Sequence, residues 1–301
     1  MVADTLAPTL SEAARALALV LATVLSAPHG ASAQPGSVDA GDRIPRCPRT
    51  GPVHITGTIR NPLIDEISGL AVSHRFDNTI WAQEDSGNGP YLYAFGASGK
   101  RRSRKEVIDA TNFDWEDLAL ADGKLWIGDI GDNARIRNEI RVWWFPEPRR
   151  GGSTVRARML TLHYPHGKRF NAEALIVHGR SEALFVFTKE NDISRVFATD
   201  VRRLRDGALR TLHRVATIGR AQPLTDVTAA DVGPLGIVVK GWERGYLYPW
   251  TRSGRVPAAL RLRPCSVPVG PGEAIGFGQK GRSWFTIPEG STPSISKIAV
   301  R

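Results

Sequence analysis

The chain has 301 residues, 42% of them hydrophobic, and a formal net charge of +10 at pH 7. This is enough chain to bury a large core as one domain. A basic balance permits binding to nucleic acid or acidic polymers, but the arginines fall mainly in predicted outer strands without interleaved aromatic residues. We therefore expect a solvated basic rim and no nucleic-acid partner.

Residues 1–33 have the pattern of an export signal. Arg15 precedes the apolar run ALALVLATVLSA, and AlaSerAla at 31–33 is a small-residue cleavage site. The run is too short to span a bilayer as a stable helix. Because Glu12 offsets Arg15, an uncleaved anchor is the alternative. We expect an exported, periplasmic or extracellular monomer without a transmembrane segment in the mature chain.

Residues 34–52 are rich in Pro, Gly and polar residues and are predicted to form a flexible lead-in. Residues 53–301 contain five copies of one repeat. The first strands of these copies are ISGLAVS, WEDLALA, AEALIVH, VTAADVG and GEAIGFG. An apolar second strand follows each of them, and a third follows in most. Four copies have an arginine-rich fourth strand, at RSRKEVID, VRARMLTLHY, LRTLHRVATI and ALRLRPC.

Four short strands in each period of roughly 40 to 50 residues are typical of a β-propeller blade. We therefore predict an all-β fold, a β-propeller of five blades, although an undetected degenerate blade would make six. The fifth copy lacks its fourth strand, and VHITGTI from Val53 has no other partner. We expect this N-terminal strand to complete the last blade and close the ring.

The two cysteines of the chain are Cys47 and Cys265. Cys47 precedes the closing strand, and Cys265 ends the predicted fourth strand ALRLRPC of the preceding blade. In an exported protein this favours a disulfide that ties the ring shut, with two free thiols as the alternative. Two cysteines are too few for a zinc site.

The segment from Phe113 to Asn133 reads as two strands joined at AspGly, a strong hairpin signal. Glu116 and Asp117 come before its first strand, and Asp129 and Asp132 follow its second. Since paired antiparallel strands bring these ends together, the four carboxylates are expected at one edge.

Alignment of the five first strands places one residue of each in a common column. These residues are Ser68, Glu116, Glu173, Thr228 and Glu273. The innermost strands line the axis, so the glutamates should converge and raise one another's pKa unless they are neutralised. Ca²⁺ fits, because it takes several oxygen ligands. Pairing with Lys189 and Lys240, where second strands end, is the competing explanation, and both remain open.

The loops on the same side of the blades add candidate ligand contacts. They are Asp85, Asn88, Lys189, Lys240 and the aromatic Trp242. Five other tryptophans fall in strands and are expected in the core: Trp81, Trp126, Trp143, Trp144 and Trp284. The HYPHG segment, with His163 and His166, is expected in a loop or strand end, since nothing nearby completes a metal site.

EISGLAVS, IWAQEDSGNGPYLYAFGASGK and DWEDLAL with KLWIGDIGDN resemble exported bacterial β-propellers of the SdiA-regulated and phytase-esterase-like type. The likeness is best from Glu66 to Asn133 and returns at NAEAL, VTAAD and GEAIG. It implies a propeller with acidic, Ca²⁺-binding loops. On this resemblance Glu66, Glu116, Glu173 and Glu273 are candidate site residues.

Two classes of function follow from the acidic face. As a binding module, the protein would hold Ca²⁺ and recognise a ligand or protein partner there. As an enzyme, it would hydrolyse a phosphoester, lactone or glycoside by metal-assisted or acid/base chemistry. The catalytic candidates are Glu116, Glu173 and Glu273. The metal-ligand candidates are Glu66, Glu116, Asp129, Asp132, Glu173 and Glu273. We favour binding, because the acidic residues spread around the ring.

Overall fold

Asp122 and Gly123 form the tight hairpin turn that the sequence predicts. In the computed structural model their φ angles are 49° and 68°. Type I′ turns, which fit the twist of a two-residue β-hairpin, require positive φ at both of these positions. The turn joins β6 (Trp115–Ala121) to β7 (Lys124–Asp129). The structure describes residues 46–149, 151–219 and 226–301.

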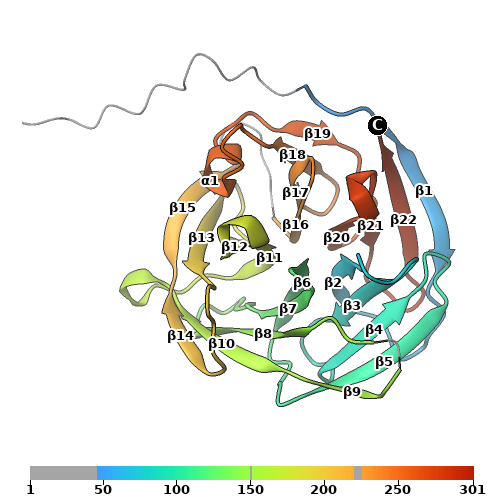
Figure 1. Ribbon diagram of the computed structural model, residues 1–301, viewed down its shortest axis with the longest axis horizontal. Coiled ribbons are helices and arrows are strands. Elements are labelled where there is room, and N and C mark those ends of the chain that lie inside the picture. The colour runs from blue at the N-terminus through green and yellow to red at the C-terminus, as the bar shows by residue number, and fades with distance from the viewer. Residues whose placement is uncertain (1–45, 150, 220–225) are drawn as a thin grey trace, which may run out of the picture. The chain divides into compact units, whose positions relative to one another are not determined.

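Five sheets surround a common axis as the blades of a β-propeller (Figure 1). From the axis outward, blade 1 contains β2 (Ile67–Val72), β3 (Ile80–Glu84), β4 (Tyr91–Phe95), β5 (Arg101–Ile108) and β9 (Thr154–Arg156). Blade 2 contains β6, β7, β8 (Ile140–Pro146), β10 (Arg158–His163) and β14 (Ala208–Thr211). Blade 3 contains β11 (Ala172–His178), β12 (Ala183–Thr188), β13 (Ser194–Asp200) and β15 (His213–Ile218).

Blade 4 contains β16 (Ala229–Gly233), β17 (Gly236–Lys240), β18 (Gly245–Pro249) and β19 (Cys265–Val267). Blade 5 contains β20 (Ala274–Phe277), β21 (Ser283–Ile287), β22 (Ser294–Val300) and β1 (Thr50–Thr58). Short helical segments are α1 (Val256–Ala259), η1 (Pro165–Gly167), η2 (Gly179–Ser181) and η3 (Gln279–Gly281). The all-β five-bladed fold is therefore confirmed, with no sixth sheet in the described ranges.

Strand β1 closes the ring, as predicted, by pairing antiparallel with β22. It begins at Thr50, so three residues of the predicted lead-in belong to the strand. Cys47 and Cys265 form a disulfide with a Cα–Cα distance of 5.6 Å, which fastens the chain just before β1 to β19 of blade 4. The segment that leads into β1 is thus covalently linked to the neighbouring blade 4.

Two predicted fourth strands are each divided between two blades, which corrects the sequence assignment. VRARMLTLHY splits at the buried Ala157, so that β9 joins blade 1 and β10 joins blade 2. LRTLHRVATI splits at Leu212 between blades 2 and 3 in the same way. Each added strand pairs in parallel with the fourth strand of the preceding blade. It satisfies backbone groups that an open sheet edge would leave unpaired.

The predicted fourth strand ALRLRPC is also wrong in most of its length. Only Cys265 of this segment belongs to β19, while Ala259 lies in α1 and the arginines follow it in a turn. The buried Leu260 packs into the apolar cluster between blades 3 and 4. A helical turn brings this side chain inward, whereas the flanking arginines stay at the surface.

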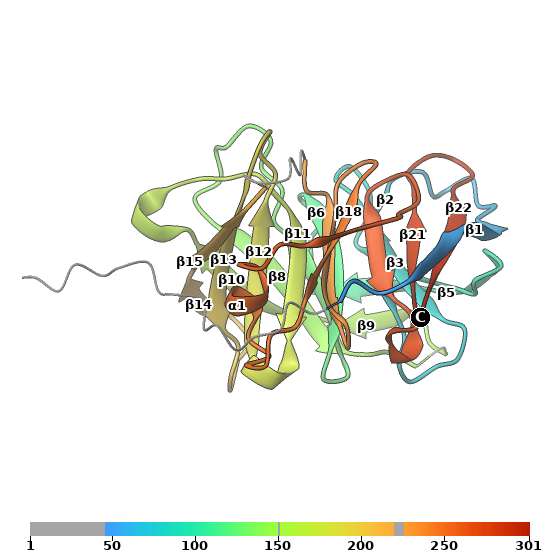
Figure 2. The same cartoon turned by 90° about the horizontal axis from the view of Figure 1, so that it is seen from above.

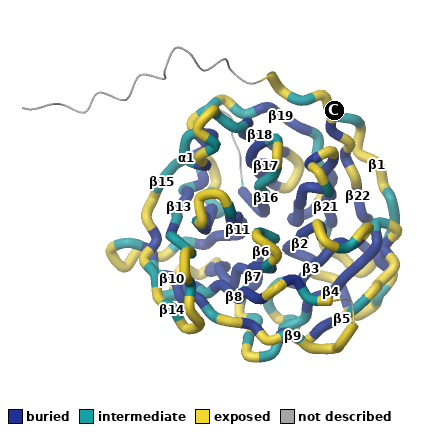
Figure 3. Tube along the Cα trace, in the orientation of Figure 1, coloured by how far each residue is buried: buried dark blue, intermediate teal, exposed yellow. Residues whose placement is uncertain are grey.

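Five apolar clusters form the core, each between two neighbouring blades. The inner strands are almost wholly buried and the outer strands largely exposed, as Figure 3 shows. All five tryptophans predicted in the core are buried: Trp81, Trp126, Trp143, Trp144 and Trp284. Packing of flat sheets face to face therefore buries most of the aromatic surface and holds the inner strands upright around the axis (Figure 2).

The predicted export signal, residues 1–33, and the lead-in up to residue 45 lie outside the described residues. Among the residues that are described, no helix has the length and apolar character needed to cross a membrane.

Candidate functional site

A β-bulge in each of three inner strands sets the direction of the residue that the repeat alignment places in the common column. The register shifts between Ile67 and Gly69 in β2, and equivalent shifts occur in β6 and β11. The residues skipped are Ser68, Glu116 and Glu173. Such bulges re-aim a side chain. The sequence alignment predicted which residues share this position, but it did not predict the bulges that direct their side chains.

The three predicted glutamates converge at the axis. Carboxylate oxygens of Glu116, Glu173 and Glu273 all lie within 4.8 Å of one another, and the three residues are buried. The convergence expected from the repeat is therefore confirmed. The Ser68 and Thr228 hydroxyls, expected to add oxygens, donate to the backbone carbonyls of Glu116 and Glu273, at 2.6 and 3.1 Å. Ser68 Oγ also lies 3.4 Å from Glu116 Oε2.

Two aspartates extend this group toward the surface. Oxygens of Asp85, Asp114 and Glu116 also lie within 4.8 Å of one another, so Glu116 belongs to both groups. Asp85 follows β3 and Asp114 precedes β6. We call the five carboxyl groups the hub: Asp85, Asp114, Glu116, Glu173 and Glu273. Asp85 was predicted as a ligand contact, whereas Asp114 was not among the predicted ligands.

The backbone at Gly131 packs directly against two carboxyl groups of the hub. A Cβ at this position would overlap Glu116 Oε1 and Asp114 Oδ2. Glycine is therefore the residue that lets the backbone approach both carboxyl groups. The GDIGDN segment carries this glycine, but its spacing alone did not reveal the role.

Burial is the main reason that the hub carboxyl groups hold protons tightly. Desolvation, followed by repulsion from Glu173, raises the pKa of Glu273 to about 8. Desolvation and then the neighbouring Asp85 raise the pKa of Asp114 to about 6. The pKa of Glu116 is raised well above its usual value, first by burial and then by Glu173. Ionised carboxylates at this density require a counter-charge.

Lys189 supplies part of that counter-charge. Its Nζ lies 2.6 Å from Glu173 Oε2 and 3.8 Å from Glu273 Oε1. Burial lowers the pKa of this lysine, but the hydrogen bond to Glu173 and the combined attraction of Glu173, Glu273 and Glu116 outweigh burial, so its pKa is raised. Among the described residues, Lys189 is the cation in ion-pair contact with the hub, while Arg137 and Lys240 attract Asp114 and Glu273 from farther away.

Lys240 does not take part in the predicted lysine pairing. Its buried Nζ donates to the carbonyls of Gly241 and Trp242, at 2.7 and 2.9 Å. Burial lowers its pKa to about 8. In the described ranges this ammonium has no carboxylate within ion-pair distance. It holds the turn that carries Trp242, so only half of the lysine-pairing hypothesis is supported.

Asp129 and Asp132, predicted as metal ligands, lie outside both oxygen groups. Asp129 forms a 2.9 Å ion pair with Arg137. Asp132 accepts hydrogen bonds from the backbone N–H groups of Ile136 and Arg137, both at 2.9 Å. The two aspartates therefore shape the loop after β7, which corrects the expectation that they join the glutamates.

Asp117, the fourth carboxylate of the hairpin, is buried and links three inner strands. It accepts hydrogen bonds from the backbone N–H groups of Leu175 in β11 and Ala230 in β16, at 2.9 and 3.3 Å. Burial raises its pKa well above the usual value. Its neighbour Glu116 faces the hub, whereas Asp117 holds the blades together.

Glu66 is exposed and lies beside the hub instead of in it. It accepts a 2.9 Å hydrogen bond from Asn88 Nδ2. Glu66 lines an acidic cavity of about 760 Å³ with Trp242, which is 45% exposed, and with Glu243 and Glu289. Glu289 is hydrogen-bonded to Glu273 of the hub. The predicted aromatic contact is thus open to a ligand on the acidic side.

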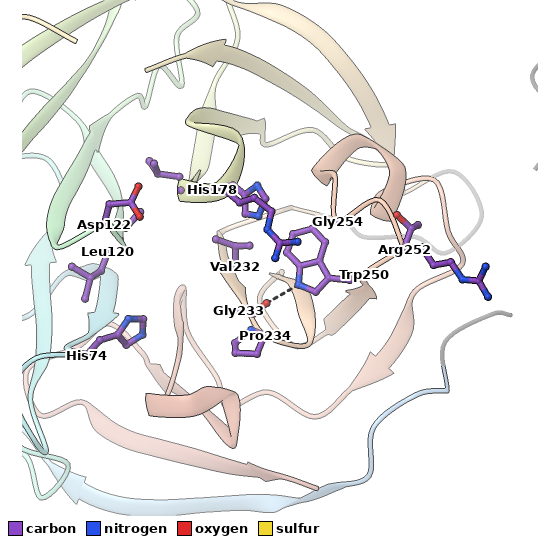
Figure 4. Close-up of a pocket in the computed structure, with 15 residues that line it drawn as sticks. His74, Leu120, Asp122, His178, Val232, Gly233, Pro234, Trp250, Arg252 and Gly254 are labelled. Atoms are coloured by element: carbon purple, nitrogen blue, oxygen red, sulfur yellow. Dashed lines mark hydrogen bonds between the residues drawn. The ribbon is translucent and has the colours of Figure 1, made fainter. Parts of the chain in front are cut away.

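A second cavity, of about 580 Å³, lies at the other end of the inner strands (Figure 4). Figure 4 shows His74, Leu120 and Asp122 on one side of it and Trp250 with Pro234 on the other. Trp250 Nε1 donates to the carbonyl of Gly233 at 2.8 Å. None of the predicted site residues lines this cavity, so the acidic side remains the candidate functional site.

Comparison with protein-family models and with curated proteins finds no match to this chain. The resemblance to SdiA-regulated and phytase-esterase-like propellers therefore stays a prediction, and the site is interpreted from its geometry.

Proposed function

We propose that this protein is an exported binding protein whose hub holds a divalent cation of the Ca²⁺ class. The observation that carries this proposal is the charge imbalance: five carboxyl groups meet in a largely buried site, and Lys189 supplies the one ammonium group that lies at ion-pair distance in the described ranges. A hard cation stabilises ionised carboxylates where water is excluded. Gly131 agrees with the proposal, because a side chain there would overlap Glu116 and Asp114 and displace their oxygens.

The oxygen spacing suits such an ion. Ca²⁺ binds oxygen at about 2.3 to 2.6 Å, so oxygens on opposite sides of one ion are about 4.6 to 5.2 Å apart. The oxygens of both hub groups lie within 4.8 Å. Glu116 belongs to both groups and is thus the residue whose loss would affect cation binding most. The Cys47–Cys265 disulfide agrees with an oxidising compartment outside the cytosol.

The cavity beside the hub supports recognition of a ligand from the same side. Trp242 offers an exposed indole surface, and Glu66 and Glu243 offer carboxylates. An aromatic face among carboxylates attracts positively charged groups. A cation in the hub would supplement this surface with a positive centre that accepts ligand oxygens.

A hydrolase remains the second candidate, because one observation favours it. Burial raises the pKa of Glu173 and Lys189 opposes this shift, while burial and repulsion from Glu173 raise the pKa of Glu273 to about 8. Two neighbouring carboxyl groups in different surroundings are the pair that acid/base hydrolysis uses. In a screen of phosphoesters, lactones and glycosides, a substrate cleaved by the wild type and not by Glu273→Gln would support this candidate.

Calorimetric titration with Ca²⁺ and Mg²⁺ tests the proposed function. We expect the wild type to bind Ca²⁺ and Glu116→Gln to bind it at least tenfold more weakly, because a neutral amide replaces the carboxylate shared by both groups. Glu243→Gln is the matched control, since Glu243 is exposed and lies outside the hub. Equal Ca²⁺ binding by all three proteins, or no binding by the wild type, would refute the proposal.

A further inference from the structure

A cavity of about 440 Å³ lies on the outer side of blade 3, apart from the hub. Strands β13 and β15 form one side, and the segment around η1 forms the other. Three permanently charged or strongly basic side chains line it: Lys168, Arg195 and Arg214. Two histidines, His166 and His213, also line it, and no carboxylate does. We call it the rim cavity.

Aromatic rings form the floor of the rim cavity. Phe170 and Phe197 line it with ring centroids 5.2 Å apart. Behind them, the ring of Tyr164 lies edge-on to both, at 5.0 Å from each. Phe197 and Tyr164 are buried, so the floor is part of the packed core and keeps its shape.

The loop wall of the cavity is anchored to the neighbouring blade. His166 and Gly167 turn the chain with φ angles of 57° and 63°. Arg169 Nη2 donates to Asn138 Oδ1 at 2.6 Å, and His163 Nδ1 lies 3.1 Å from the Asn138 carbonyl. The HYPHG segment, which the hub does not use, thus places a histidine and a lysine at a fixed opening.

The charges of the cavity are mostly without acidic partners. Arg195 pairs with Glu190, and its guanidinium carbon lies 5.5 Å from the Phe170 ring centroid. For Lys168 and Arg214, no carboxylate within the described ranges lies at ion-pair distance. Arginine side chains match phosphate and carboxylate groups with paired N–H donors.

We propose that the rim cavity binds an organic anion. A phosphate or carboxylate group lies among Lys168, Arg195 and Arg214, and the ring or apolar part of the ligand lies on Phe170 and Phe197. The cations supply attraction and the aromatic floor supplies apolar contact, so a ligand with both parts binds more tightly than a ligand with either part alone.

Titration followed by NMR tests this with four small probes at low salt. Phenyl phosphate and benzoate carry both parts and distinguish phosphate from carboxylate ligands, inorganic phosphate carries only charge, and benzyl alcohol carries only the ring. We expect phenyl phosphate or benzoate to bind at least fivefold more tightly than inorganic phosphate and benzyl alcohol. Equal affinity for all four probes, or no binding of any, would overturn the proposal.

The double variant Lys168→Ala and Arg214→Ala should weaken binding of the better probe at least tenfold. Both residues are exposed, so the fold should be retained, which a thermal melt checks. The control replaces two exposed arginines of β5, Arg101→Ala and Arg102→Ala, and removes the same charge from another blade. If both double variants weaken binding equally, the attraction comes from overall charge and not from the rim cavity. Ca²⁺ titration of the same variants shows whether the hub is unchanged, so a failure of the rim cavity is distinguished from a failure of the hub.

Discussion

The hub and the rim cavity each gather side chains of one sign, but in opposite surroundings. The hub carboxyl groups lie among buried strands, where burial raises the pKa of Glu116 and Glu273. Lys168 and Arg214 of the rim cavity lie at the surface, where water and salt screen their repulsion. A like-charge cluster is therefore costly only when it is buried. The hub needs protons or a cation to be stable, whereas the rim cavity is stable without its ligand.

The largest effect should come from pH without metal ions. A carboxyl group with a raised pKa stabilises the fold below its unfolded-state pKa and loses this effect as pH rises through its folded-state pKa. These folded-state pKa values are about 6 for Asp114 and about 8 for Glu273. In chelator, the free energy of unfolding should fall between pH 5 and pH 8.5, by on the order of 5 kcal/mol.

Urea unfolding at several pH values, with chelator and with Ca²⁺, measures this effect. Ca²⁺ should flatten or reverse the pH dependence, because the cation replaces the protons. Identical curves with chelator and with Ca²⁺ would show that no ion occupies the hub.

Loss of the hub ammonium group should have the next largest effect. Lys189→Met leaves Glu173 without its 2.6 Å partner, and breaking a mostly buried ion pair costs about 3 kcal/mol. Lys168→Met, the matched change at the rim cavity, should stay within about 0.5 kcal/mol of the wild type. Denaturant unfolding in chelator at pH 7 compares the two, and similar losses in both variants would remove the contrast between hub and rim cavity.

A smaller effect is expected from a single methyl group at Gly131, beside the hub. Gly131→Ala should lower Ca²⁺ affinity at least tenfold, since the new Cβ overlaps oxygens of Glu116 and Asp114. Gly151→Ala is the control, because its Cβ would meet no atom within 4 Å and its φ is not positive. Calorimetry measures both affinities. Wild-type affinity in the Gly131 variant would place the cation elsewhere.

The smallest effect should be that of the rim cavity on folding. Arg214→Ala should change the free energy of unfolding by no more than about 0.5 kcal/mol, at low and at high salt, because exposed charges contribute little. Urea unfolding at two NaCl concentrations checks this. A clear gain in stability at low salt would show that the rim cations repel one another as strongly as buried charges.

Much of the fold could be predicted because its signals are local and repeated. The hairpin at Asp122 needs only the AspGly pair, and the column with Glu116 and Glu173 needs only the repeat. The strands divided at Ala157 and Leu212 could not be predicted, since a continuous apolar and basic pattern does not show which sheet edge each half joins. Edge pairing depends on the position of the neighbouring blade.

The site was predicted in the same uneven way. Asp129 and Asp132 have the residue type and spacing of ligands, yet Arg137 pairs with Asp129 Oδ1 and backbone N–H groups bond both oxygens of Asp132. Lys240 has the position of a counter-charge, but its ammonium group donates to two carbonyls. A carboxylate or an ammonium group pairs with or hydrogen-bonds to the partner that lies nearest in the folded protein. The spacing of residues in the sequence does not identify that partner.

The sequence alone determined the five blades, the closing strand and the approach of three glutamates to one axis. These features follow from the strand pattern and the repeat length, which can be read directly from the order of the residues. Only the tertiary structure decided which carboxyl groups are buried together, that the Gly131 backbone packs against two of them, and that Lys189 is the lysine of the described ranges that forms an ion pair with them. Burial and contact arise when strands far apart in the chain pack against one another, and these contacts set the cost of each charge.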